Sequence, residues 1–326
     1  MAKEITEKKV LDALSKIVEP GLEKKLIETD LIREVTVKDS TVYITRAFLS
    51  PGYPGQNEIE DEIIEKLKGL DGIDKVKVKS ILDVPFDGRI KEAGLFSIKN
   101  VIAVASGKGG VGKSTVAVNI AVSLAKNGAN VGLLDADVYG PNIPMMMGVD
   151  QLPPQDTSKG KITPAEAYGV KLVSIGFMVK PEQPIVWRGP LLHSAIKQFI
   201  QDVDWGDVDY LVVDLPPGTG DAQLSLAQTI SITGGVIVTL PQQVSLEDAR
   251  RGLEMFRKLD IPILGVVENM SYLELPDGQK MDIFGTGGGK KLAKVTNVDF
   301  LGAIPIDPTI REGGDKGKPI VITAPD

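Results

Sequence analysis

A glycine-rich segment limits the possible folds of this chain more than any other feature. Gly107 to Thr115 reads GKGGVGKST and fits the pattern G-x-x-x-x-G-K-[S/T]. The apolar run 101–105 before it predicts a buried strand, and 114–126 after it predicts a helix. A strand, loop and helix in this order form a phosphate-binding loop, because the backbone amides and the positive end of the helix face the phosphates.

The loop predicts both a nucleotide ligand and a metal. We expect ATP to contact the whole loop: Gly107, Lys108, Gly109, Gly110, Val111, Gly112, Lys113, Ser114 and Thr115. Lys113 should reach the β- and γ-phosphates, and the Ser114 hydroxyl should bind Mg²⁺. The alternative is a glycine-rich turn that matches the pattern by chance.

Two further apolar runs end in aspartates. Asp135 and Asp137 follow the run 131–134, and Asp214 follows the run 210–213. Because the carboxyl ends of parallel strands meet at one crevice, the three carboxylates should converge there. We expect Asp214 to hold Mg²⁺ with Asp135 near the metal, and Asp137 to orient the attacking water. Each aspartate could instead be a helix cap or a turn residue.

The segment 216–221 follows the last of these aspartates and reads PPGTGD. It combines a rigid proline pair with flexible glycines. We expect it to be a switch loop in which the Gly218 amide senses the γ-phosphate.

Short apolar runs recur throughout the chain after residue 100. They cover 101–105, 131–134, 170–175, 210–213, 236–239, 263–267 and 300–304. They are continuous rather than alternating, which indicates burial on both faces. With helical segments between them, they predict an α/β fold with a mostly parallel sheet and helices on both faces.

The first part of the chain has a different pattern. It is rich in charge, and its expected elements are a helix at 8–17, two strands within 36–48, a helix at 57–67 and a strand at 74–81. The order α-β-β-α-β predicts a small α+β domain. We therefore expect this domain at 1–85, a linker at 86–97 and the α/β domain at 98–326.

Composition excludes several kinds of protein. The net charge of −7 argues against a nucleic-acid binder held by bulk charge. Cysteine is absent, which excludes disulfides, thiolate metal sites and cysteine nucleophiles, and His193 is the only histidine. No apolar run approaches the length of a membrane span and the first residues are charged, so we expect a cytoplasmic protein without a membrane partner.

Several motifs resemble a known family. The loop with its second lysine, Lys108, is similar to the deviant Walker A motif KGGxGK[S/T] of the MinD, ParA and nitrogenase-reductase class. The matching segments are 106–115, 135–144, 186–190, 214–221, 268–272, 283–289 and 304–307. Together they resemble the Mrp/ApbC family of P-loop ATPases, and residues 5–85 resemble the SufT-like domain that often precedes it.

The resemblance implies a cytoplasmic homodimeric ATPase that carries iron–sulfur clusters to apoproteins, with slow, switch-like turnover. It implies that Lys108 crosses the dimer interface to the partner's nucleotide, where the alternative is a solvated loop lysine. It also implies that Asn269 contacts the adenine and that the backbone from Pro305 to Asp307 closes the base pocket. The alternative for Asn269 is a turn residue at a strand end.

The chain departs from the family pattern at the cluster ligands. The family usually has C-P-x-C where 273–278 reads LELPDG, and T-P-x-C-P where 50–55 reads SPGYPG. Because iron–sulfur clusters are held chiefly by thiolates, cluster ligation is in doubt for this chain. A cluster-free, nucleotide-gated scaffold that recruits partners through the N-terminal domain and 273–284 is the second hypothesis. A ParA/MinD-type positioning ATPase is the third.

Overall fold

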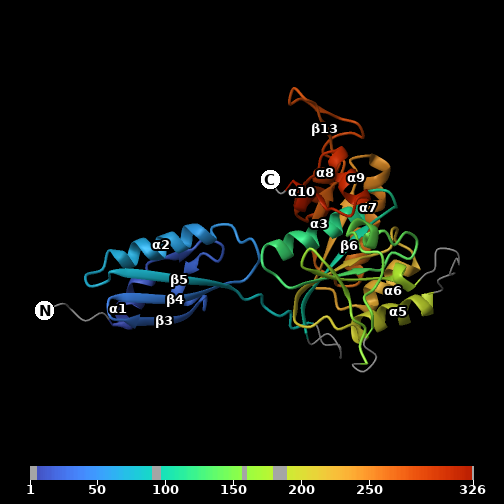
Figure 1. Cartoon of the computed structure of the whole chain (residues 1–326). Coiled ribbons are helices and arrows are strands. Elements are labelled where there is room, and N and C mark those ends of the chain that lie inside the picture. Colours follow the sequence, from blue (N-terminus) through green and yellow to red (C-terminus); the bar gives the residue numbers. More distant parts are fainter. Residues whose placement is uncertain (1–5, 90–96, 156–159, 179–188, 325–326) are drawn as a thin grey trace. The chain divides into compact units, whose positions relative to one another are not determined.

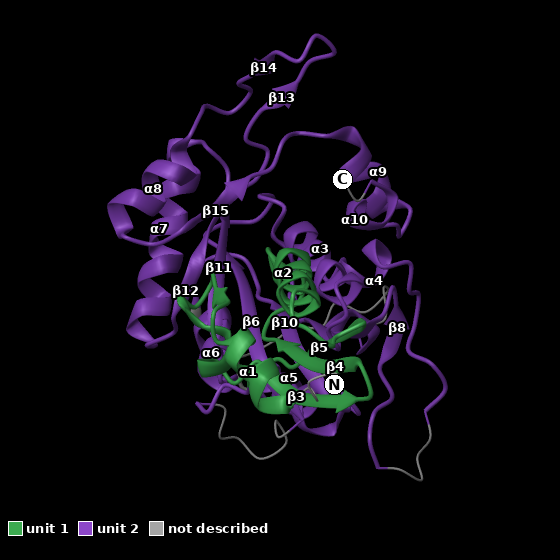
Figure 2. Cartoon of the chain, turned by 90° about the vertical axis from the view of Figure 1, so that its left-hand side faces the viewer, with its two compact units in different colours: residues 1–85 green, residues 86–326 purple. Residues whose placement is uncertain are grey.

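The computed structural model describes residues 6–89, 97–155, 160–178 and 189–324. Most of the predicted linker, 90–96, and residues 186–188 of one family motif lie outside them. The chain divides into two compact units, residues 1–85 and residues 86–326. Figure 2 draws them in different colours.

Unit 1 is a three-stranded sheet with helices on one side. Its elements are α1 (Glu7–Leu14), β1 (Val18–Glu19), β2 (Lys24–Lys25), a 3₁₀ turn (Leu26–Glu28), β3 (Ile32–Lys38), β4 (Thr41–Phe48), α2 (Gln56–Lys68) and β5 (Lys75–Leu82). The sheet order is β3-β4-β5, with β3 antiparallel and β5 parallel to β4. Alternate residues of β4, such as Val42 and Ile44, pack against Leu14 of α1 and Ile63 of α2 in one apolar core.

Unit 2 begins with the strand before the glycine-rich loop. Its first elements are β6 (Ile98–Ser106), α3 (Lys113–Lys126), β7 (Val131–Asp135), α4 (Ile143–Met146), β8 (Ala165–Ala167), β9 (Val170–Ser174), a 3₁₀ turn (Ile175–Met178), α5 (Gly189–Asp202) and β10 (Val208–Asp214). The rest are α6 (Asp221–Thr229), β11 (Gly234–Thr239), α7 (Gln243–Lys258), β12 (Ile263–Glu268), β13 (Leu273–Glu274), β14 (Lys280–Met281), α8 (Gly288–Thr296), β15 (Phe300–Ala303), α9 (Pro308–Asp315) and α10 (Ile320–Thr323).

The large sheet of unit 2 has eight strands in the order β15-β12-β11-β6-β10-β7-β9-β8. All neighbours are parallel except the edge pair β8–β9, which is antiparallel. Helices cover both faces, with α3 on one face and α7 and α8 on the other (Figures 1 and 2). The α/β fold with a mostly parallel sheet is therefore confirmed.

The topology explains where the chemistry gathers. The buried central strands β6, β10 and β7 are adjacent, and the register pairs Asp214 with both Val104 and Asp135. The loop after β6 and the aspartates that end β7 and β10 therefore share the carboxyl edge of the sheet. In the part of the chain that the structure describes, no helix is both long and apolar enough to cross a bilayer.

Candidate nucleotide site

Glycines shape the loop between β6 and α3 for two separate reasons. Gly110 and Gly112 have φ values of +80° and +82°, in the left-handed region that side chains disfavour. A Cβ on Gly107 would overlap the backbone of Asp248 in α7, and a Cβ on Gly112 would overlap the Asn269 amide. The loop therefore lies directly against α7 and against the end of β12.

Lys113 lies in a buried network of charges at the first turn of α3. Its ammonium is 2.6 Å from Oδ1 of Asp214 and 3.3 Å from Oδ2 of Asp137. The Ser114 hydroxyl donates to Oδ2 of Asp214 at 2.5 Å. The structure thus brings together the lysine, the hydroxyl and two of the three carboxylates that the sequence singles out.

Asp135 completes the network from the neighbouring strand. It is fully buried, and it accepts hydrogen bonds from the Ser174 hydroxyl and from the Asp137 amide. Burial and the adjacent Asp214 carboxylate raise the pKa of Asp135 to about 8. Burial also raises the pKa of Asp214, and the Lys113 ammonium opposes this rise.

A cavity of about 370 Å³ opens above this network. It is lined by Ser106, Lys108, Gly109, Gly110, Gly112, Lys113, Ser114, Thr115, Asp137, Tyr139, Gly140, Asn142, Met146 and Pro217. Lys108 is half-buried and lines this cavity. Gly218 follows Pro217, and its amide donates to the Ser106 carbonyl at 2.9 Å. This amide is therefore already hydrogen-bonded within the chain.

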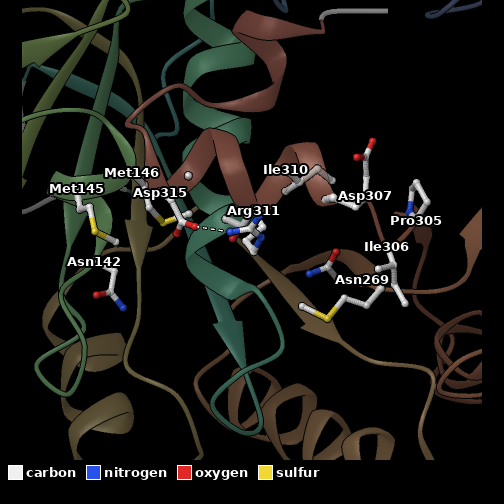
Figure 3. Close-up of a pocket in the computed structure, with 14 residues that line it drawn as sticks. Asn142, Met145, Met146, Asn269, Pro305, Ile306, Asp307, Ile310, Arg311 and Asp315 are labelled. Atoms are coloured by element: carbon white, nitrogen blue, oxygen red, sulfur yellow. Dashed lines mark hydrogen bonds and ion pairs between the residues drawn. The ribbon is translucent and has the colours of Figure 1, made fainter.

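A second cavity of about 640 Å³ adjoins the first and shares Thr115, Asn142 and Met146 with it. Figure 3 shows Asn269, Pro305, Ile306 and Asp307 around this cavity, together with an ion pair between Arg311 and Asp315 of α9. Its walls are mainly apolar, as a planar base requires. The structure thus places Asn269 and the segment 305–307, which are expected at the base pocket, in the lining of one cavity.

Asn269 is positioned by its own hydrogen bonds. Its amide nitrogen donates to the Val111 carbonyl at 2.8 Å, and its backbone amide donates to the Thr239 carbonyl. This ties the phosphate loop to the base pocket.

Sequence reasoning missed several residues of this region. Glu268 is buried and accepts from the Gly289 amide and the Ser271 hydroxyl, each at 2.5 Å, so it joins the end of β12 to the first turn of α8. The second group lines the base cavity: Met145, Met146, Arg311 and Asp315. Glu268 could have been noticed in the sequence, because it is a charged residue that ends an apolar run directly before Asn269. The residues of α9 can be recognised only once the fold is known.

The donors present suit one Mg²⁺ at the phosphate site. A serine hydroxyl and a buried carboxylate lie together beside the phosphate cavity, and oxygen donors of this kind are what Mg²⁺ prefers. Over the described residues, no cluster of three or more His, Asp or Glu side chains is arranged to hold a metal by itself. The set is therefore one that phosphate oxygens and water would complete.

The segment in which the resemblance leads one to expect C-P-x-C is a short hairpin. Strands β13 and β14 pair antiparallel, and the ammonium of Lys280 lies 4.0 Å from the centre of the Tyr272 ring. The hairpin extends away from the sheet (Figure 2). His193 is on α5, where its Nδ1 is 2.7 Å from the Thr229 hydroxyl. Neither place offers a thiolate, because the chain has no cysteine.

Comparisons with known proteins agree with this architecture. Residues 97–326 match the family model of the NUBPL iron-transfer P-loop NTPase, and residues 7–80 match that of an iron–sulfur cluster assembly protein. An iron–sulfur cluster carrier protein of Synechocystis is 48% identical over 99% of this chain and 93% of its own length. An Arabidopsis mitochondrial iron–sulfur protein required for NADH dehydrogenase is 51% identical over 73% of this chain and 76% of its own.

A solved structure extends the comparison to bound nucleotide. A nucleotide-binding protein of Archaeoglobus fulgidus in complex with ADP is 38% identical and covers 69% of this chain and 88% of its own, with a TM-score of 0.61. The fold and the phosphate loop thus define a P-loop NTPase. Within that class, this chain belongs to the iron-transfer P-loop NTPase family whose relatives are iron–sulfur cluster carrier proteins.

Proposed function

We propose that the protein is a dimeric ATPase that carries or assembles iron–sulfur clusters, with ATP hydrolysis as a slow switch. One observation carries the nucleotide part of this proposal: Lys113, Ser114 and Asp214 converge beside a cavity that continues into an apolar pocket at Asn269. Family membership supports the cargo. Its partners are accordingly the iron–sulfur assembly machinery or apoprotein clients.

The charge network suggests how nucleotide binding begins. The Lys113 ammonium is paired with Asp214 and Asp137. The β- and γ-phosphates offer it a stronger negative partner, so their arrival releases both carboxylates. Ser114 and Asp214, with Asp135 nearby, would hold Mg²⁺, which would supply positive charge to neutralise the phosphates.

The remaining residues have roles in hydrolysis and signalling. Asp137 orients the attacking water, and Lys108 reaches the nucleotide of the partner subunit. The Gly218 amide exchanges the Ser106 carbonyl for the γ-phosphate, which moves the switch loop. Turnover is then on the order of 10⁻² s⁻¹ or slower, as in P-loop switches that await an activator.

The nucleotide role is tested with Lys113→Ala. Loss of the ammonium removes the main cationic partner of the phosphates and should weaken ATP binding by roughly 100-fold or more. Binding is measured by calorimetry, with Lys290→Ala as the control because Lys290 is an exposed lysine of α8. Since Lys113 also pairs with Asp214, circular dichroism must show that the variant is folded. A folded variant with unchanged ATP affinity would refute the assignment.

The absence of cysteine limits how this protein could carry an iron–sulfur cluster. Iron–sulfur clusters are held chiefly by thiolate ligands, and this chain has none. We therefore expect any cluster that it handles to take thiolates from another molecule, such as a low-molecular-weight thiol or a client protein. Anaerobic reconstitution with iron and sulfide, with and without glutathione, tests this. We expect bound iron and sulfide after desalting only with the thiol; no bound cluster in either arm, with ATPase activity intact, contradicts direct carriage.

A further inference from the structure

The outer face of the unit 1 sheet carries an ordered set of polar side chains. Helices α1 and α2 share an apolar core with the inner face, to which Val42, Ile44 and Val76 contribute. Alternate residues point to the other face. The strand register places them in three rows: Lys38–Thr41–Lys75, Thr36–Tyr43–Lys77 and Glu34–Thr45–Lys79.

The charge of this outer face is opposite to that of the unit. Residues 1–85 contain 14 lysines and arginines and 17 aspartates and glutamates, which is a net charge of −3. The nine positions of the outer face hold four lysines and one glutamate, and all four lysines are exposed. Among the described side chains, none of these lysines forms an ion pair. The positive charge is thus concentrated and available.

The lysines of β5 also have a regular spacing. Lys75, Lys77 and Lys79 alternate along one strand, so successive ammonium groups leave the sheet about 7 Å apart. Alternate carboxylates of an extended acidic segment have the same repeat. The hydroxyl groups of Thr41 and Thr45 in the neighbouring strand add hydrogen-bond donors for such carboxylates.

The same face is poorly suited to nucleic acid. Tyr43 is its single aromatic residue, and the Lys77 ammonium lies 5.1 Å from the centre of that ring. The ring is thus already engaged by a cation rather than free to stack on a base. The net charge of the unit would also repel a long polyanion, whereas a short acidic segment meets mainly the local lysines.

We propose that the outer face of the unit 1 sheet, defined by the nine residues above, is a docking surface for an acidic segment of a partner protein. The partner lies along β5 with alternate carboxylates on Lys75, Lys77 and Lys79. This function is separate from nucleotide binding and does not depend on cluster handling. Lysines on an edge strand also prevent edge-to-edge pairing of sheets, but that role alone predicts no acidic ligand.

The test uses the full-length chain and a labelled poly-L-glutamate peptide of about 20 residues. Fluorescence anisotropy measures binding to the wild type, to a triple variant Lys75→Glu, Lys77→Glu and Lys79→Glu, and to a control triple variant. The control changes three exposed lysines of unit 1 away from this face to glutamate: Lys16, Lys66 and Lys68. Both variants change the net charge equally. Circular dichroism establishes that both are folded.

We expect the variant of the outer face to bind the peptide at least about tenfold more weakly, and the control to stay within about twofold of the wild type. Binding should weaken as salt rises from about 50 to about 150 mM. An equal loss in both variants would show bulk charge only and overturn the proposal. So would tighter binding of a single-stranded oligonucleotide of about 20 nucleotides, or no binding of the peptide by the wild type.

Discussion

At the scale of single residues, Gly112 connects the phosphate loop to the base pocket. Its φ of +82° and its contact with the Asn269 amide both exclude a side chain. The Gly112→Ala variant should therefore suffer both backbone strain and a clash that displaces Asn269. We expect weaker ATP binding and a lower free energy of unfolding, measured by calorimetry and urea denaturation.

Gly128 provides a matched control. It also has a positive φ, +91°, but a Cβ there would meet no atom within 4 Å. Gly128→Ala should lower the free energy of unfolding by about 1–2 kcal/mol, because only backbone strain is introduced. It should leave ATP affinity unchanged. If the two variants have the same ATP affinity, the clash with Asn269 has no functional consequence.

Asp135 makes the stability of unit 2 depend on pH. Its pKa is about 8 in the folded state and about 4 when unfolded, so the folded state keeps a proton that the unfolded chain loses between these values. The stabilisation that comes from protonated Asp135 is fully present below pH 4. The free energy of unfolding then falls as the pH rises from 4 towards 8. We expect Asp135→Asn to reduce this slope, by up to about 1.4 kcal/mol per pH unit, in urea denaturation without nucleotide. If the variant and the wild type had the same pH dependence of the free energy of unfolding, Asp135 would not be a protonated carboxyl in the folded state.

At the scale of elements, Asp307 begins α9 beside the base pocket. Its Oδ1 accepts from both the amide and the hydroxyl of Thr309 at 2.7 Å, and these bonds lower its pKa. Asp307→Ala should reduce the free energy of unfolding by ~1 kcal/mol, whereas Asp307→Asn should keep most of the cap. Because the pKa is lowered, the stabilisation is present above pH 4 and is lost as pH falls through the folded value. Equal stability of the two variants in urea would show that the cap contributes nothing.

The elements also show what sequence could predict. Short but continuous apolar runs identified seven of the eight strands of the large sheet, because burial on both faces leaves no alternation. The edge strand β8 and the hairpins β1–β2 and β13–β14 have only two or three residues each, too few for any period. In the site, motif spacing identified Lys113 and Asp214, but their ion pair depends on side-chain packing that no spacing reveals.

At the scale of the whole molecule, the two units have separate apolar cores, one in residues 10–76 and one in 98–293. We expect two thermal transitions in scanning calorimetry. ATP at about 100 times its Kd should raise only the transition of unit 2, by roughly 5–10 °C, because ligand binding stabilises only the unit that binds. The Lys113→Ala variant is the control and should show no shift. A single transition that moves as a whole with ATP would contradict independent units.

The approach of Gly107 to the backbone of α7 has a mechanical consequence. The gap between Gly107 and the backbone of Asp248 is too narrow for even a methyl group. A displacement of the loop by a fraction of an ångström must therefore either push the helix or break its packing, because close-packed interiors transmit strain rather than absorb it. The outward side of α7 carries Arg250 and Arg251, both exposed. A shift of the phosphate loop on nucleotide binding would therefore be transmitted to this exposed surface of α7, which lies outside the cavity itself.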